Sequence, residues 1–228
     1  MLTLKITFRY CIALYCITML YASLHELIHH FSAYFICGAW GYKSFNYFST
    51  ACEGTLKSWY ATYTGPLFNF IMMYIGAALL KGDSNYKKHL GFAMIFAQLP
   101  LQRMISPFFR MNDEFIATIS LFGNTPLNYW LVIILIWVIC IPPLVKAFLA
   151  IQNSHRWLWF LFYLILFPYL LWGPVFGTLE YLMVNKHVLD QQIIGIGLLF
   201  ILNEIVTIIA YYLTKRYIDP GYNKKSPA

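Results

Sequence analysis

Long apolar runs dominate this sequence and restrict what it can fold into. A run of about 20 apolar residues is long enough to cross the hydrocarbon core of a bilayer as a helix. Backbone polar groups cannot stay unpaired in lipid, so each such run is expected to be helical. The runs, separated by short polar connections, cover residues 9–40, 59–80, 89–109, 127–150, 156–184 and 192–213.

The composition agrees with a membrane protein. Hydrophobic residues make up 60% of the 228 residues and charged residues only 11%, whereas soluble domains carry about 25% charged residues. We therefore predict an all-α integral membrane protein of about six transmembrane helices, for which a bacterial plasma membrane is a compatible location. The first run follows Lys5 and Arg9, but it contains charged residues and lacks a small-x-small cleavage site. We interpret it as a retained helix rather than a signal peptide.

The net charge of +7 indicates membrane topology rather than nucleic-acid binding, because the basic residues lie mostly in the connections. With six crossings, the segments on the same side of the membrane as the N-terminus carry most of the lysines and arginines. The positive-inside bias then places both termini inside, with the lipid bilayer as a partner and no nucleic acid. The five cysteines form no CxxC pair, so we expect neither a disulfide framework nor a thiolate zinc site.

Two connections have features of their own. Residues 41–58 are too polar to cross a membrane and partly alternate, which favours a strand or hairpin on the membrane face. Residues 109–126 begin polar and become an amphipathic helix, with Asn112 as its cap and Asp113 and Glu114 in its first turn. The tail, residues 219–228, is polar and rich in proline and glycine, so we expect no regular structure there.

The segment SLHELIHHFS, residues 23–32, holds the most concentrated group of polar side chains in the apolar runs. His25, Glu26 and His29 form an HExxH motif. On a helix, residues four apart share a face, so the two imidazoles can bind one zinc ion while Glu26 acts as a general base. His30 points about 100° away from His29 and is interpreted as a neighbour, not a ligand.

This motif, followed by TGPLFNF at 64–70, resembles the site-2 protease family of intramembrane zinc proteases. The family carries a Gly-Pro-x-x-Asn element on the core helix that follows its HExxH helix. Gly65, Pro66 and Asn69 match this element. The resemblance implies that Asn69 positions the substrate or the developing oxyanion. An alternative is that Gly65-Pro66 starts a helix after a Thr64 cap, with Asn69 forming an interhelical hydrogen bond.

The resemblance also implies a third zinc ligand, an aspartate from a third helix within Asn-x-x-Pro…Asp-Gly. This chain has Gln98-x-Pro100 in place of Asn and Pro, and Asp113 is followed by Glu114 rather than glycine. Asp113 is the predicted ligand, with Glu114 as the alternative. Glu180 and Glu204 are the next candidates. Arg103 is expected to pair structurally with Asp113, Glu114 or another acid.

Together these features predict a site-2-protease-like catalytic core at 1–126 and three accessory transmembrane helices with a polar tail at 127–228. The expected function is a zinc-dependent endopeptidase that hydrolyses a peptide bond in or near a membrane-spanning helix of a protein substrate. The resemblance implies that the 41–58 segment pairs with the extended substrate as an added strand. The alternative is a non-catalytic membrane protein, a metal transporter or a scaffold. A transporter is expected to spread polar residues over several spans, and the last three runs offer only isolated ones.

Overall fold

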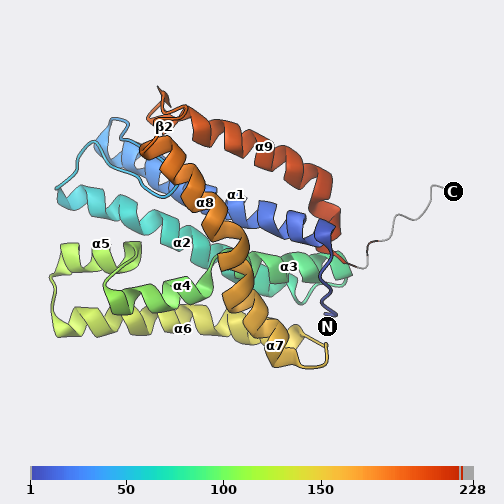
Figure 1. Cartoon of the computed structure of the whole chain (residues 1–228). Coiled ribbons are helices and arrows are strands. Elements are labelled where there is room, and N and C mark those ends of the chain that lie inside the picture. Colours follow the sequence, from blue (N-terminus) through green and yellow to red (C-terminus); the bar gives the residue numbers. More distant parts are fainter. Residues whose placement is uncertain (1, 221, 223–228) are drawn as a thin grey trace.

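Helices make up most of the chain in the computed structural model, which describes residues 2–220 and 222 (Figure 1). The predicted irregular tail therefore lies mostly outside the described residues. The elements in chain order are α1 (Phe8–Cys37), α2 (Leu56–Leu79), α3 (Asn85–Ala97), α4 (Pro100–Ile105), the 3₁₀ turn η1 (Ser106–Phe109), α5 (Asp113–Phe122), α6 (Pro126–Ala150), α7 (Arg156–Leu161), the π-helical turn η2 (Phe162–Leu166), α8 (Phe167–Val184), β1 (Gln192–Ile193), β2 (Ile196–Gly197), α9 (Leu198–Thr214) and the 3₁₀ turn η3 (Lys215–Ile218).

Four helical stretches are long and apolar enough to cross a membrane. They are Phe8–Cys37, Pro126–Ala150, Arg156–Val184 and Leu198–Ile218. Their presence confirms the predicted helical class and indicates a membrane protein. The number of six crossings stays a prediction.

Short polar side chains determine where several helices begin. The side-chain oxygens of Thr7, Ser84 and Thr125 accept hydrogen bonds from backbone N–H groups in the first turns of α1, α3 and α6. Asn112 Oδ1 accepts from the N–H of Phe115 at 3.1 Å, which confirms the predicted cap of α5. Such caps satisfy donors that would otherwise have no partner at a helix start.

The third apolar run is not one helix, so the prediction of a single continuous helix over 89–109 is wrong. Helix α3 ends at Ala97, and the chain turns at Leu99, whose φ of 51° lies in the left-handed region. Pro100 explains the break, because a proline disfavours the right-handed helical conformation in the residue before it. The chain then continues through α4 and η1 into α5, and Figure 1 shows α4 and α5 between α2 and α6.

Helix α1 packs against α2 on one side and α9 on another (Figure 1). The largest core cluster joins α1, α2, α3, α6 and the α7–α8 region, with Tyr10 and Phe92 both in edge contact with Tyr163. A smaller cluster surrounds Phe45, whose ring contacts those of Phe176 in α8 and Phe200 in α9. Burial of large aromatic side chains of this kind dominates core packing.

The connection after α1 contains the predicted hairpin. Lys43 pairs with Phe48 in the antiparallel sense and with Ile196 of β2 in the parallel sense. The N–H of Ser44 donates to the carbonyl of Tyr47 at 2.8 Å and closes the turn. The 42–49 hairpin therefore joins the β1–β2 pair, and the connections that follow α1 and α8 meet at one end of the molecule.

The connections at the other end also meet. Leu2 bonds through its backbone to Ala150 and Gln152, and Asn153 exchanges two hydrogen bonds with the backbone of Leu4. Arg9 donates to the hydroxyl of Tyr217. The N-terminal segment, the α6–α7 connection and η3 therefore lie together.

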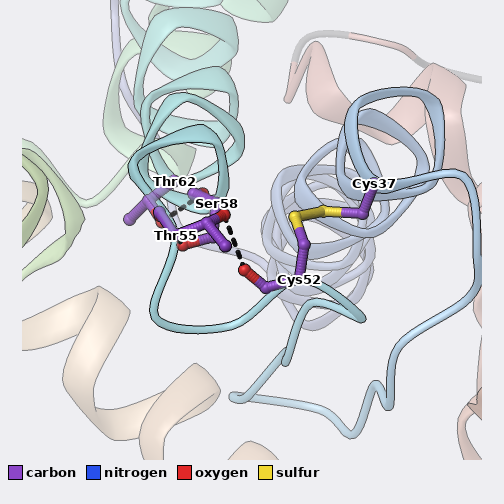
Figure 2. Close-up of a disulfide and its surroundings, with 5 residues drawn as sticks. All are labelled: Cys37, Cys52, Thr55, Ser58 and Thr62. Atoms are coloured by element: carbon purple, nitrogen blue, oxygen red, sulfur yellow. Dashed lines mark hydrogen bonds between the residues drawn. A yellow bond between two sulfur atoms is a disulfide. The ribbon is translucent and has the colours of Figure 1, made fainter.

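Cys37 and Cys52 form a disulfide (Figure 2), a single cross-link that the expectation of no disulfide framework did not anticipate. Their Cα atoms are 5.4 Å apart, because Gly38 ends α1 in a left-handed turn and the hairpin returns the chain to the same helix end. Thr55 Oγ1 donates to the carbonyl of Cys52 at 2.8 Å, and Ser58 Oγ donates to the carbonyl of Thr55 at 2.7 Å. The disulfide thus fixes the hairpin connection between α1 and the start of α2.

Candidate metal centre

The structure brings together the three residues predicted as metal ligands. Nε2 of His25 lies 3.0 Å from Oδ2 of Asp113 and 3.1 Å from Nε2 of His29, and the third side of this triangle, from His29 to Asp113, is 3.3 Å. Both histidines are buried, and Asp113 is half-buried. The two histidines are one helical turn apart on α1, and Asp113 is the first residue of α5.

The size of this triangle fits a tetrahedral metal site. Four ligands at the zinc bond lengths of 2.0–2.1 Å would lie about 3.4 Å from one another, and the three edges here measure 3.0–3.3 Å. Two imidazoles and a carboxylate are a donor set that suits zinc, and three protein ligands leave the fourth position open, as in catalytic zinc sites. The identity of the metal stays a prediction.

Glu26 lies beside the triangle rather than in it. Its Oε1 is 4.0 Å from Nε2 of His25, and 13% of its side chain is exposed. Glu26 also lines the cavity next to the triangle. This placement is what a general base needs, because the carboxylate must reach a water at the open position without occupying it.

The ring of His29 is held from two directions. Its Nδ1 lies 2.9 Å from the carbonyl oxygen of Ala61, and the ring stacks on that of Phe48 with centroids 4.4 Å apart and planes at 6°. A hydrogen bond from Nδ1–H to a carbonyl leaves Nε2 as the metal-binding atom. Pro66 lies inside α2 and has no N–H to donate to the carbonyl of Thr62, the residue after Ala61.

Gly65 allows the two histidine rings to approach α2. A Cβ atom at this position would overlap Nε2 of His29 and lie 2.6 Å from Cε1 and 2.7 Å from Nδ1 of His25. The absence of a side chain therefore makes room for the triangle. Gly65 and Pro66 lie well inside α2, which begins at Leu56, so the interpretation that they start a helix after a Thr64 cap is wrong.

Glu114 is directed to Arg103 and not to the triangle. Its Oε1 accepts from Nη1 of Arg103 at 2.8 Å, and both side chains are largely buried. The expected structural pairing of Arg103 with an acid is therefore present. Because Asp113 and Glu114 are successive residues in the first turn of α5, their side chains diverge, and only Asp113 contacts the two histidines.

Asn69 forms the interhelical contact that one of its two interpretations predicted. With its amide oxygen turned toward Arg103, the oxygen accepts from Nη2 and from Nε, the latter at 3.0 Å, and the amide nitrogen donates to Oε1 of Gln98 at 3.1 Å. Asn69 is buried on α2 and lines the cavity. Its role toward a substrate stays a prediction.

The two remaining acidic candidates have other partners. Glu180 of α8 accepts from Ser44 Oγ at 2.7 Å and from the N–H of Phe45 at 2.8 Å, so it holds the turn of the hairpin. Glu204 of α9 accepts from Ser23 Oγ at 2.6 Å. Neither belongs to the metal-ligand group found among the described residues.

His30 likewise contacts a connection. Its Nε2 lies 2.9 Å from the carbonyl oxygen of Ile194, and its ring stacks on Trp40.

Lys43 is a buried charge that the sequence reasoning treated only as part of a polar connection. Its side chain is fully buried, with Nζ 2.7 Å from the carbonyl of Ser44 and 3.4 Å from the ring centre of Phe200. Burial lowers the pKa of Lys43 to about 8, and the carboxylates of Glu26, Glu204 and Glu180 act in the opposite direction. Its position in a short polar stretch between aromatic residues was the only sequence signal.

A cavity of about 300 Å³ lies beside the triangle. Its walls come from α1, α2, the α3–α5 region, the hairpin turn and α8, and include Glu26, Asn46, Asn69, Arg103, Asp113 and Phe176. The cavity thus places polar groups from several helices next to the three metal-ligand candidates.

Comparison of the chain with protein-family models, curated proteins and solved structures finds no match.

Proposed function

We propose that this chain is an intramembrane zinc-dependent endopeptidase that hydrolyses a peptide bond in or near a membrane-spanning helix. One observation carries the proposal: His25, His29 and Asp113 form a triangle of metal-ligand size, the Glu26 carboxylate lies beside it, and His25, Glu26 and Asp113 line one cavity. A free carboxylate next to a three-ligand site is the arrangement that metal-assisted hydrolysis requires.

In this proposal three residues would bind the metal ion, and a fourth transfers a proton. A zinc ion bound by His25, His29 and Asp113 would lower the pKa of a water and polarise a peptide carbonyl. Glu26 accepts the proton of the attacking water as the new carbon–oxygen bond forms, and later donates it to the amine nitrogen as the carbon–nitrogen bond breaks. The Ala61 carbonyl and the Phe48 ring keep His29 in the orientation that this chemistry needs.

The substrate class follows from where the cavity lies. Two of its walls belong to α1 and to α8, which is part of the stretch Arg156–Val184, and both α1 and this stretch are long and apolar enough to cross a membrane. A helical substrate hides its carbonyl groups in internal hydrogen bonds, so the cleaved segment must be extended. The 42–49 hairpin reaches the cavity through Asn46, and an extended peptide can add to a strand edge there.

The proposal includes six crossings with both termini inside. The connections at the ends of helices α1, α8 and α9 form two groups, which lie at opposite ends of the molecule. The disulfide lies in the group that the charge distribution places outside, and disulfides persist in oxidising compartments outside the cytosol. Two independent features therefore support the same orientation, with the metal centre nearer the outer side.

A cleavage assay tests the proposal. The purified chain is reconstituted with a reporter protein that carries one membrane-spanning helix. We expect cleavage that stops on chelation and returns with zinc, and no cleavage by Glu26→Gln. Cleavage at the wild-type rate by metal-free protein, or by Glu26→Gln, would contradict it.

A further inference from the structure

Arg103 places a permanent positive charge in the wall of the cavity. It belongs to α4, and only 12% of its side chain is exposed. Glu114 binds Nη1, and the Asn69 oxygen binds Nε and Nη2. Besides this ion pair, Arg103 lines the cavity together with Glu26 and Asp113.

One contact of Arg103 depends on whether His25 holds a metal. Nη2 of Arg103 lies 3.3 Å from Nδ1 of His25, and arginine can only donate hydrogen bonds. Nδ1 accepts this bond only in the tautomer that carries its proton on Nε2. When Nε2 binds a metal, the proton of a neutral imidazole is on Nδ1. One N–H of Nη2 then stays on the Asn69 oxygen, and the other loses its acceptor.

A buried donor without an acceptor is costly, and Arg103 already lines the cavity beside the metal-ligand candidates. A peptide carbonyl oxygen beside the metal centre would supply the missing acceptor. Charge-assisted hydrogen bonds to an oxygen grow stronger as negative charge develops on it.

We propose that Arg103 is a catalytic residue that donates to the carbonyl oxygen of the scissile peptide bond. This proposal rests on the endopeptidase function above. As water oxygen bonds to the carbonyl carbon, one water proton passes to Glu26 and the carbonyl π electrons move to the oxygen that Arg103 contacts. When the carbonyl re-forms, the carbon–nitrogen bond breaks and Glu26 returns the proton to the amine. One water is consumed.

The test removes the charge without leaving the buried Glu114 carboxylate unpaired. The double variant Arg103→Met/Glu114→Gln is compared with Glu114→Gln alone, which keeps the arginine. Metal content, kcat and KM are measured for the reconstituted reporter, together with the affinity of a peptide phosphonamidate that mimics the tetrahedral intermediate. Affinity for the uncleaved reporter is measured in an added Glu26→Gln background.

Relative to Glu114→Gln, the double variant is expected to keep its zinc and its affinity for the uncleaved reporter. We expect kcat to fall by about 100- to 1,000-fold, the range for loss of one oxyanion donor, and phosphonamidate affinity to fall in parallel. Arg103→Gln/Glu114→Gln gives the same comparison if the methionine variant does not fold.

Equal kcat and equal phosphonamidate affinity in the double variant and Glu114→Gln would overturn the role of Arg103. Parallel loss of zinc, reporter affinity and kcat would also overturn it, because that pattern indicates a structural role. Failure of the wild-type chain to bind zinc and to cleave would instead overturn the endopeptidase proposal itself.

Discussion

Gly65→Ala should damage the metal centre much more than it damages the fold. The added methyl group would lie 2.6 Å from Cε1 of His25 and would overlap Nε2 of His29, whereas comfortable contacts are about 3.5–4.0 Å. The rings must retreat by roughly 1 Å, but metal–ligand distances tolerate only about ±0.2 Å. His29 is fully buried and bonded to Ala61, so it has little room to adjust.

The two effects on stability partly offset each other. Overpacking costs about 1–3 kcal/mol, while alanine is favoured over glycine inside a helix by about 1 kcal/mol. We therefore expect a net loss of about 0–2 kcal/mol in the free energy of unfolding. Zinc affinity should fall by at least about 10- to 100-fold, the range seen when groups that orient metal ligands are altered.

Gly76→Ala is the matched control, because it lies on the same helix but away from the triangle. Its added Cβ would be 2.7 Å from the carbonyl oxygen of Gly91 and 3.0 Å from Cγ1 of Ile95. It should lower stability by a similar mechanism and keep the affinity for zinc. Affinity is measured by competition with a chelator in detergent. If Gly65→Ala binds zinc as tightly as Gly76→Ala does, the close packing of α2 on the histidines is not needed for metal binding.

Three further outcomes are expected. Asp113→Asn should lose most of its zinc by metal analysis, while Glu114→Gln keeps it; the reverse result would make Glu114 the ligand. In protein that lacks its free cysteines but keeps the disulfide, Lys57→Cys should react with an impermeant reagent in intact cells and Asp83→Cys should not; the opposite pattern would invert the topology. Replacing both disulfide cysteines with serine should lower the free energy of unfolding by about 3 kcal/mol, measured by chemical denaturation against wild type; an unchanged value would show that the cross-link does not contribute.

Local spacing made the first part of the site predictable. His25 and His29 share a face because they are one helical turn apart, and this holds in any helix that contains them. Asn112 also signalled the start of α5 through its capping chemistry. Those features depend on neighbours in sequence, so the sequence carried enough information to place Asp113 at a helix start.

Features that depend on tertiary contact were not predictable in the same way. Cys37 and Cys52 are 15 residues apart, and spacing alone does not bring their Cα atoms to 5.4 Å. The need for Gly65 arises from an adjacent helix rather than from its own. Lys43 belongs to a polar connection, yet the meeting of the hairpin with α9 buries it. Pro100 signalled a break, but the apolar run around it suggested a continuous span.

Metal content of three variants tests the central assignment most directly, because it separates the residues that hold the metal from the one that moves the proton. Protein purified without chelator should contain about one zinc ion per chain. Glu26→Gln should keep that zinc and lose cleavage, while His25→Ala and His29→Ala should lose most of it. Equal zinc content in the wild type and all three variants would contradict the assignment of the histidines as ligands.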